Sequence, residues 1–174
     1  DDPLAQVASN AIWALGVCVM SLGEDVLPYL DGFLERMVRL LRIRDLENSL
    51  LMNIAVTLGR LSLVVPAAMA PHVPGFFDDW MNSLATTEEG EEKEQALRGM
   101  VAVIYQDPAA VASHFRAIAE VVSSCDEPSD ELTVTLTELL AMFHESFGAA
   151  WPDQLRRISA ATREDLIRRF GVTM

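Results

Sequence analysis

The sequence predicts an all-α fold built as a stack of helix pairs, and three observations support this prediction. Prolines and glycines separate apolar stretches of helical period, and no stretch alternates like a strand rich in β-branched residues. Part of the sequence also repeats itself at an offset of 43 residues. The 174 residues are 51% hydrophobic and 22% charged, so the chain can bury enough apolar surface to offset the entropy lost on folding. We therefore expect one folded domain over residues 1–174.

The apolar pattern predicts seven or eight helices in order along the chain, with a short C-terminal pair counted as one. Pro28 and Pro108 lie near first-turn positions, where a missing amide hydrogen costs nothing. Ser129 and Thr162 supply capping oxygens ahead of acidic first turns, and glycines at 23, 148 and 171 mark ends. We expect helices at 4–22, 26–43, 47–65, 69–84, 91–106, 109–124 and 130–147, followed by a short pair at 152–158 and 163–170.

The uncharged run 4–23 is long enough to cross a membrane and needs an explanation. Gln6, Ser9 and Asn10 interrupt it, both flanks are acidic, and the nearest cation is Arg36, so no positively charged anchor adjoins it. These features favour an amphipathic helix buried in a protein core over a membrane span. We expect no membrane partner.

The repeat at 43 residues indicates how the helices are arranged. Six identities fall within a span of 24 positions: Asn10 on Asn53, Leu15 on Leu58, Gly16 on Gly59, Pro28 on Pro71, Gly32 on Gly75 and Phe33 on Phe76. Residues 58–61 are loosely echoed by 97–100, which indicates a degenerate third copy. Helix pairs repeating at this length are typical of HEAT or armadillo solenoids. The sequence thus predicts an α-α superhelix (HEAT-repeat solenoid), with chance similarity between Ala- and Leu-rich helices as the alternative.

A helical wheel separates a buried face from an exposed face in two helices. In 4–22 the predicted core stripe is Leu4, Ala8, Ala11, Ile12, Leu15, Cys18, Val19 and Leu22. Trp13 points the other way, in the company of Gln6, Ser9, Asn10, Val17 and Met20. In 47–65 the residues outside the core stripe are Ser49, Met52, Asn53, Val56, Arg60 and Leu63. An exposed Trp among apolar neighbours is a candidate hot spot for an extended peptide. The alternative is that Trp13 packs in the core.

The charge of the chain restricts its partners. Its formal net charge is −13 at pH 7, which repels phosphate backbones and attracts basic proteins or peptides. We therefore expect no nucleic-acid partner. The acidic run 88–94 has two interpretations, a helix N-terminus favoured by the macrodipole or an electrostatic attraction for basic ligands.

No pattern of catalytic or metal-binding residues is present in the sequence. His72, His114 and His144 lie far apart and belong to no ligand motif. Phosphate loops, dinucleotide-binding glycine motifs and a serine nucleophile elbow are also missing. Cys18 and Cys125 are most simply small core hydrophobes in a reducing compartment. The sequence argues against an enzyme and predicts neither a cofactor nor a metal.

Three segments carry a resemblance to a known family. They are Ser9-Asn10-Ala11-Ile12-Trp13-Ala14-Leu15-Gly16, Met52-Asn53-Ile54-Ala55-Val56-Thr57-Leu58-Gly59-Arg60-Leu61 and Glu91-Glu92-Lys93-Glu94-Gln95-Ala96-Leu97-Arg98-Gly99. The chain resembles the C-terminal HEAT repeats of the transportin family of karyopherin-β nuclear import receptors, in register along nearly its whole length. The resemblance makes 1–174 a single C-terminal HEAT-repeat domain, and we expect it to be a fragment of a longer solenoid.

The resemblance implies a function and a set of binding residues. Members bind cargo nuclear localisation signals of the proline-tyrosine type on the concave face, and the matching positions here are Trp13, Asn53 and Val56, with Asn10 beside them. Val17 and Met52 replace two glutamates of the family, which should favour apolar over basic signal segments.

The resemblance also implies Ran and nucleoporins as partners of the full-length receptor, and a location in cytoplasm and nucleus. Ran binding belongs to N-terminal repeats of the family, so we expect that Ran does not release cargo from this segment alone. The alternative function is a HEAT-repeat scaffold subunit for a folded protein partner.

Overall fold

The structure is a computed structural model that describes residues 3–43 and 45–173. All regular secondary structure in these residues is helical, and 3-10 turns (η) join several of the α-helices. The elements are α1 (Pro3–Leu22), η1 (Gly23–Tyr29), α2 (Leu30–Leu41), α3 (Asn48–Val64), α4 (Pro66–Met69), η2 (Val73–Gly75), α5 (Phe77–Ala85), α6 (Glu91–Ile104), α7 (Pro108–Val111), η3 (Ala112–His114), α8 (Phe115–Ser123), α9 (Asp130–Phe147), η4 (Gly148–Ala150), α10 (Trp151–Arg157) and α11 (Ala160–Phe170).

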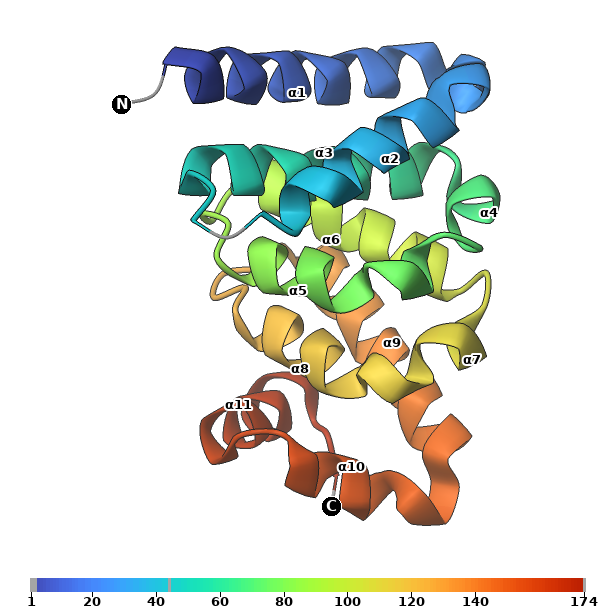
Figure 1. Cartoon of the computed structure of the whole chain (residues 1–174). Helices are drawn as coiled ribbons and strands as arrows, with labels where there is room; N and C mark the ends of the chain where they lie inside the picture. Colours follow the sequence, from blue (N-terminus) through green and yellow to red (C-terminus); the bar gives the residue numbers. More distant parts are fainter. Residues whose placement is uncertain (1–2, 44, 174) are drawn as a thin grey trace.

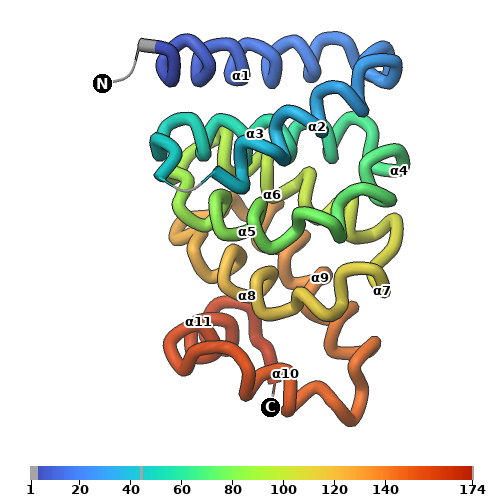
Figure 2. Tube along the Cα trace, in the orientation of Figure 1, coloured from blue at the N-terminus to red at the C-terminus, as the bar shows by residue number. Residues whose placement is uncertain are grey.

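The helices pair into two layers that stack along one direction (Figure 1). One layer contains α1, α3, α6 and α9, and the other contains α2, α5 and α8, which lie in front of α3, α6 and α9 in this view. The trace in Figure 2 runs from α1 at one end of the stack to α10 and α11 at the other. The predicted all-α superhelix of HEAT type is confirmed.

Large apolar side chains fill the space between the layers. Trp80 of α5 is fully buried, and its Nε1 donates a 3.0 Å hydrogen bond to the Ala55 carbonyl of α3. Towards the C-terminal end, Phe115 packs edge-on against Phe143 and Trp151. Each helix pair therefore buries its apolar face against the next pair, as the repeat predicts.

Two of the repeated glycines allow α3 and α6 to pack unusually closely. A Cβ atom on Gly99 would lie 1.8 Å from the carbonyl oxygen of Gly59, and one on Gly59 would lie 2.4 Å from the Cα of Ala96. Only hydrogen fits at these positions, since both opposing atoms belong to the backbone. The glycines at 59 and 99 thus set the spacing within the first layer.

Several predicted helix boundaries are confirmed, and three predicted helices are wrong because each is interrupted. The helix expected at 69–84 starts only at Phe77, because the intervening prolines at 71 and 74 fit a turn and η2. The one expected at 109–124 is broken by η3, where no Pro or Gly signals a break. The one expected at 26–43 begins as η1 and becomes an α-helix at Leu30. The helix expected at 130–147 has those bounds in the structure.

The observed N-terminal capping residue is the predicted one at α9 and a different one at α11. The Ser129 hydroxyl accepts a hydrogen bond from the Leu132 amide at the start of α9. At α11 the capping hydroxyl belongs to Ser159, three residues before the predicted Thr162. The predicted stop at Gly171 is confirmed, with a φ of 66° in the left-handed region.

The first helix is much less buried than predicted. Within its expected core stripe only Val19 is fully buried, while Leu4 is 78% exposed and Leu22 is also exposed. The reason is that α1 packs closely against α3, whereas it faces α2 across an open groove. By length and composition alone, Leu4–Leu41 could cross a membrane, but this is weak evidence because core helices and signal sequences pass the same test.

The uncovered sides of α1 and α2 enclose an apolar groove at the end of the stack. Its volume is about 400 Å³, and it is lined by Ala8, Ala11, Ile12, Leu15, Phe33, Arg36, Met37 and Leu40. This groove holds half of the apolar stripe that the sequence assigned to a core, namely Ala8, Ala11, Ile12 and Leu15.

Candidate functional site

The six residues predicted to bind a ligand lie on two neighbouring helices of the first layer. Asn10, Trp13 and Val17 belong to α1, and Met52, Asn53 and Val56 belong to α3. Hydrogen bonds that join these helices pair residues 44 or 45 positions apart, so the copies of the 43-residue repeat lie side by side in register. The structure thereby brings the two predicted segments together.

An exposed stripe runs along α1. Its members are spaced at intervals of three and four residues, so they share one helix face. They are Asn10, Trp13, Val17 and Met20, which we call the α1 stripe. The exposed fraction is 48% for Trp13 and 41% for both Val17 and Met20. The predicted exposure of Trp13 among apolar neighbours is confirmed, and the alternative of an enclosed core residue is wrong.

Asn53 and Thr57 tie α3 to α1. The side-chain amide of Asn53 donates to the carbonyl and the hydroxyl oxygen of Ser9, at 3.2 and 2.8 Å. The Thr57 hydroxyl donates to the Ile12 carbonyl at 3.0 Å. Asn53 is half-buried, and its Nδ2 already donates to Ser9 on α1. Any contact of Asn53 with a ligand would therefore involve its carbonyl oxygen.

The predicted outward orientation of Val56 is wrong. Its side chain is only 4% exposed, and Arg60 one turn later is also buried. A single-stripe wheel fails for α3 because α1 packs on one side of it and α6 on the other, so most of its circumference is covered. Met52, near the start of the helix, remains half-buried.

A polar chain links the indole of Trp13 to the third helix of the layer. Its Nε1 donates a 3.1 Å hydrogen bond to Oε1 of Glu92, a residue of α6 that is 79 positions away. Arg60 of α3 donates from Nη2 to the same oxygen at 3.3 Å and from Nε to Oε1 of Gln95 at 3.1 Å. We call Trp13, Arg60, Glu92 and Gln95 the indole network.

Most of the indole network cannot be recognised from the sequence. In the sequence, Glu92 belongs to the acidic run 88–94, and Arg60 belongs to a helix face that the wheel predicts to be exposed. No local pattern could have joined them, because the three helices that supply them are separated along the chain. The 43-residue repeat places helices of successive copies side by side but does not specify which side chains meet.

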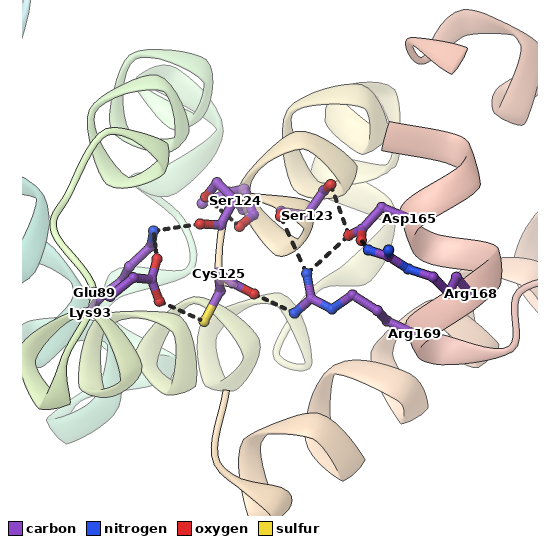
Figure 3. A network of polar contacts seen from close by, with 9 residues as sticks. Glu89, Lys93, Ser123, Ser124, Cys125, Asp165, Arg168 and Arg169 are labelled. Atoms are coloured by element: carbon purple, nitrogen blue, oxygen red, sulfur yellow. Dashed lines mark hydrogen bonds and ion pairs between the residues drawn. The ribbon is translucent and has the colours of Figure 1, made fainter. Parts of the chain in front are cut away.

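A second polar cluster joins α6, α8 and α11 (Figure 3). Lys93 is buried, and its Nζ donates to Glu89 at 2.5 Å and to the Ser124 carbonyl at 2.7 Å. Arg169 donates to the carbonyl oxygens of Ser123 and Cys125. Both cations thus satisfy the carbonyl groups that the C-terminal end of α8 leaves free.

The thiol inside this cluster is not an activated nucleophile. Burial, together with the neighbouring Glu89 carboxylate, raises the pKa of Cys125 to about 11. Its sulfur donates to Glu89 at 3.7 Å. The thiol therefore stays protonated near neutral pH. Within 3–43 and 45–173 no group of three His, Cys, Asp or Glu side chains lies where it could hold a metal ion.

Comparisons with known proteins find similar sequences among transportins and importins. No protein-family model matches it. Transportin of Dictyostelium discoideum is 31% identical over 159 residues, which is 87% of this chain and 17% of that protein. Importin subunit beta-2 of Schizosaccharomyces pombe is 32% identical over 165 residues, 91% of this chain and 18% of that protein. Transportin-1 of Homo sapiens is 32% identical over 142 residues, 82% of this chain and 16% of that protein. The chain thus spans less than one fifth of the length of these relatives.

Proposed function

This chain is homologous to the transportins over most of its length, and we propose that it binds nuclear localisation signals of cargo proteins as part of an import receptor. The signal segment lies along the α1 stripe and the adjoining edge of α3. The mechanism is equilibrium capture of an extended peptide, without covalent chemistry or a cofactor. The observation that carries the proposal is the half-exposed indole of Trp13 on a face shared by two repeats.

The chemistry of this face suits an extended signal with apolar and basic parts. Trp13, Val17 and Met20 offer apolar area that a peptide side chain can cover. The net charge of −13 attracts basic residues and speeds their encounter with the protein. By the resemblance, Val17 and Met52 stand where the family has glutamates, so this face favours the apolar parts of a signal. We propose signals of the proline-tyrosine type, with an apolar segment placed on Trp13.

The buried side chain of Val56 narrows the proposed site. Because it is almost fully covered by neighbouring helices, we assign the contacts to Asn10, Trp13, Val17, Met52 and Asn53. We further propose that residues 1–174 act as one HEAT-repeat domain of a receptor that moves between cytoplasm and nucleus. Contacts with Ran and nucleoporins are proposed only for a receptor of the length of its relatives.

A peptide-binding assay tests this function. The probe is a fluorescein-labelled synthetic peptide with an apolar and a basic segment ahead of a Pro-Tyr end, and its control is a peptide of the same composition in scrambled order. We expect saturable binding of the ordered peptide that weakens as salt is added, because exposed charges contribute to it. Equal binding of both peptides would contradict the proposal and favour the scaffold function, which needs a folded partner and a larger interface.

A further inference from the structure

Trp13 differs from the other two tryptophans in how its ring is held. Trp80 and Trp151 are buried, and their indole N–H groups donate to the carbonyls of Ala55 and Thr173 at 3.0 and 2.7 Å. Surrounding side chains therefore fix those rings by packing. The ring of Trp13 is half exposed, so its hydrogen bond to Glu92 is the main polar contact that fixes its orientation.

Glu92 is in turn held by a buried cation. The side chain of Arg60 is 7% exposed, and its Nη2 donates to the same Glu92 oxygen that accepts the indole N–H. Its Nε donates to Gln95, one turn along α6 from Glu92. Two donors from different helices thus converge on one oxygen, and charge-assisted hydrogen bonds of this kind are strong. The carboxylate has a defined place despite being 54% exposed.

The lack of a side chain at Gly16 makes room for this arrangement. A Cβ atom there would lie 2.7 Å from the Thr57 hydroxyl and 3.1 Å from Nη1 of Arg60. The guanidinium therefore occupies space between α1 and α3 that any larger residue at position 16 would reduce. The glycine on the same helix as Trp13 is part of the support for its ring.

We propose that Glu92, held by Arg60, is a positioning residue that fixes the Trp13 indole in its peptide-binding orientation. This inference rests on the proposed function for the role of Trp13. A side chain that is already ordered in the free protein loses less conformational freedom when the ligand binds, which strengthens binding. Glu92 acts through the indole and does not itself contact the peptide.

The orientation of the ring is tested on the free protein by NMR of the three indole N–H groups. The Glu92→Ala variant should shift the Trp13 signal and speed its exchange with solvent, while the signals of Trp80 and Trp151 stay in place as internal references. The matched control is Glu88→Ala, which removes one charge from the same acidic run and should leave all three signals unchanged. An unchanged Trp13 signal in Glu92→Ala would overturn the proposal.

The consequence for binding is tested with the labelled Pro-Tyr peptide. Glu92→Ala should weaken binding about three- to tenfold, whereas Glu88→Ala should change it less than about twofold. Trp13→Phe keeps an aromatic ring but removes the N–H donor, so in that background Glu92→Ala should have little further effect. An equal loss in both backgrounds would mean that Glu92 contacts the peptide directly, which contradicts a positioning role.

The experiments distinguish failure of the proposed peptide-binding function from failure of the positioning role of Glu92. If the wild-type chain bound ordered and scrambled peptides equally, the function would be refuted by that result alone. The NMR result would still decide whether Glu92 fixes the ring. Gly16→Ala gives an independent check, because it displaces Arg60 without changing the Glu92 carboxylate and should move the same Trp13 signal. A Gly16→Ala spectrum identical to wild type would count against the role of Arg60.

Discussion

Replacing Gly99 with alanine tests the close packing of α3 and α6. The added methyl group would lie 1.8 Å from the carbonyl oxygen of Gly59 and 2.7 Å from its carbonyl carbon. Because both atoms are backbone, the helices must move apart by roughly 1.5 Å to restore ordinary contact. Overpacking of this kind costs about 3 kcal/mol, and the better helix propensity of alanine returns about 1 kcal/mol. We expect a net loss of about 2 kcal/mol in the free energy of unfolding.

Thermal unfolding followed by circular dichroism measures this loss. For a domain of this size, a loss of about 2 kcal/mol lowers the Tm by about 4–8 °C. Gly32→Ala in α2 is the matched control, since no heavy atom lies within 4 Å of the added methyl group, and it should leave the Tm unchanged or raise it slightly. A Gly99→Ala protein that melts at or above the wild-type temperature would refute the reasoning about helix spacing.

Further predictions concern the polar clusters. Lys93→Met should lower stability by about 1–3 kcal/mol in the same assay, because the cation that satisfies a buried carbonyl and a carboxylate is lost. Iodoacetamide at neutral pH should modify the exposed Cys18 but leave Cys125 unmodified until the protein unfolds, since burial raises the pKa of Cys125 to about 11; mass spectrometry of the folded protein checks this. Hydrogen bonds from Ser129 lower the pKa of Glu94 from its ordinary 4.5. The contribution of the Glu94 carboxylate to stability should be complete above about pH 4.5 and be lost as the pH falls through its lowered pKa. The Tm of the Glu94→Gln protein should therefore depend less on pH in the acid range.

The stack of helix pairs could be predicted because its signal is repeated along the sequence. The match of Gly16 to Gly59, with Gly99 in the next copy, marks positions where helices approach closely, and the structure shows close approaches at all three. The interruption at η3 could not be predicted, because residues 109–124 contain neither a glycine nor a proline to signal it.

Exposure was predictable only where a helix has one covered side. The wheel correctly turned Trp13 outward on α1, yet it also placed Val56 outward on α3, which has neighbours on two sides. The low burial of α1 depends on which helices surround it, and that is not encoded in its own periodicity. The contact between Trp13 and Glu92 depends on the stacking of three helices, so it emerges only from the folded structure.

The central claim is that the indole of Trp13 binds the signal peptide and does not support the fold. Calorimetric titration of the Trp13→Ala protein with the Pro-Tyr peptide, together with its Tm, tests this most directly, with Tyr29→Ala as an exposed aromatic control outside the α1 stripe. We expect binding weaker by about 1–3 kcal/mol, which is on the order of 5- to 150-fold, with a nearly unchanged Tm. Unchanged affinity together with a large drop in Tm would contradict it.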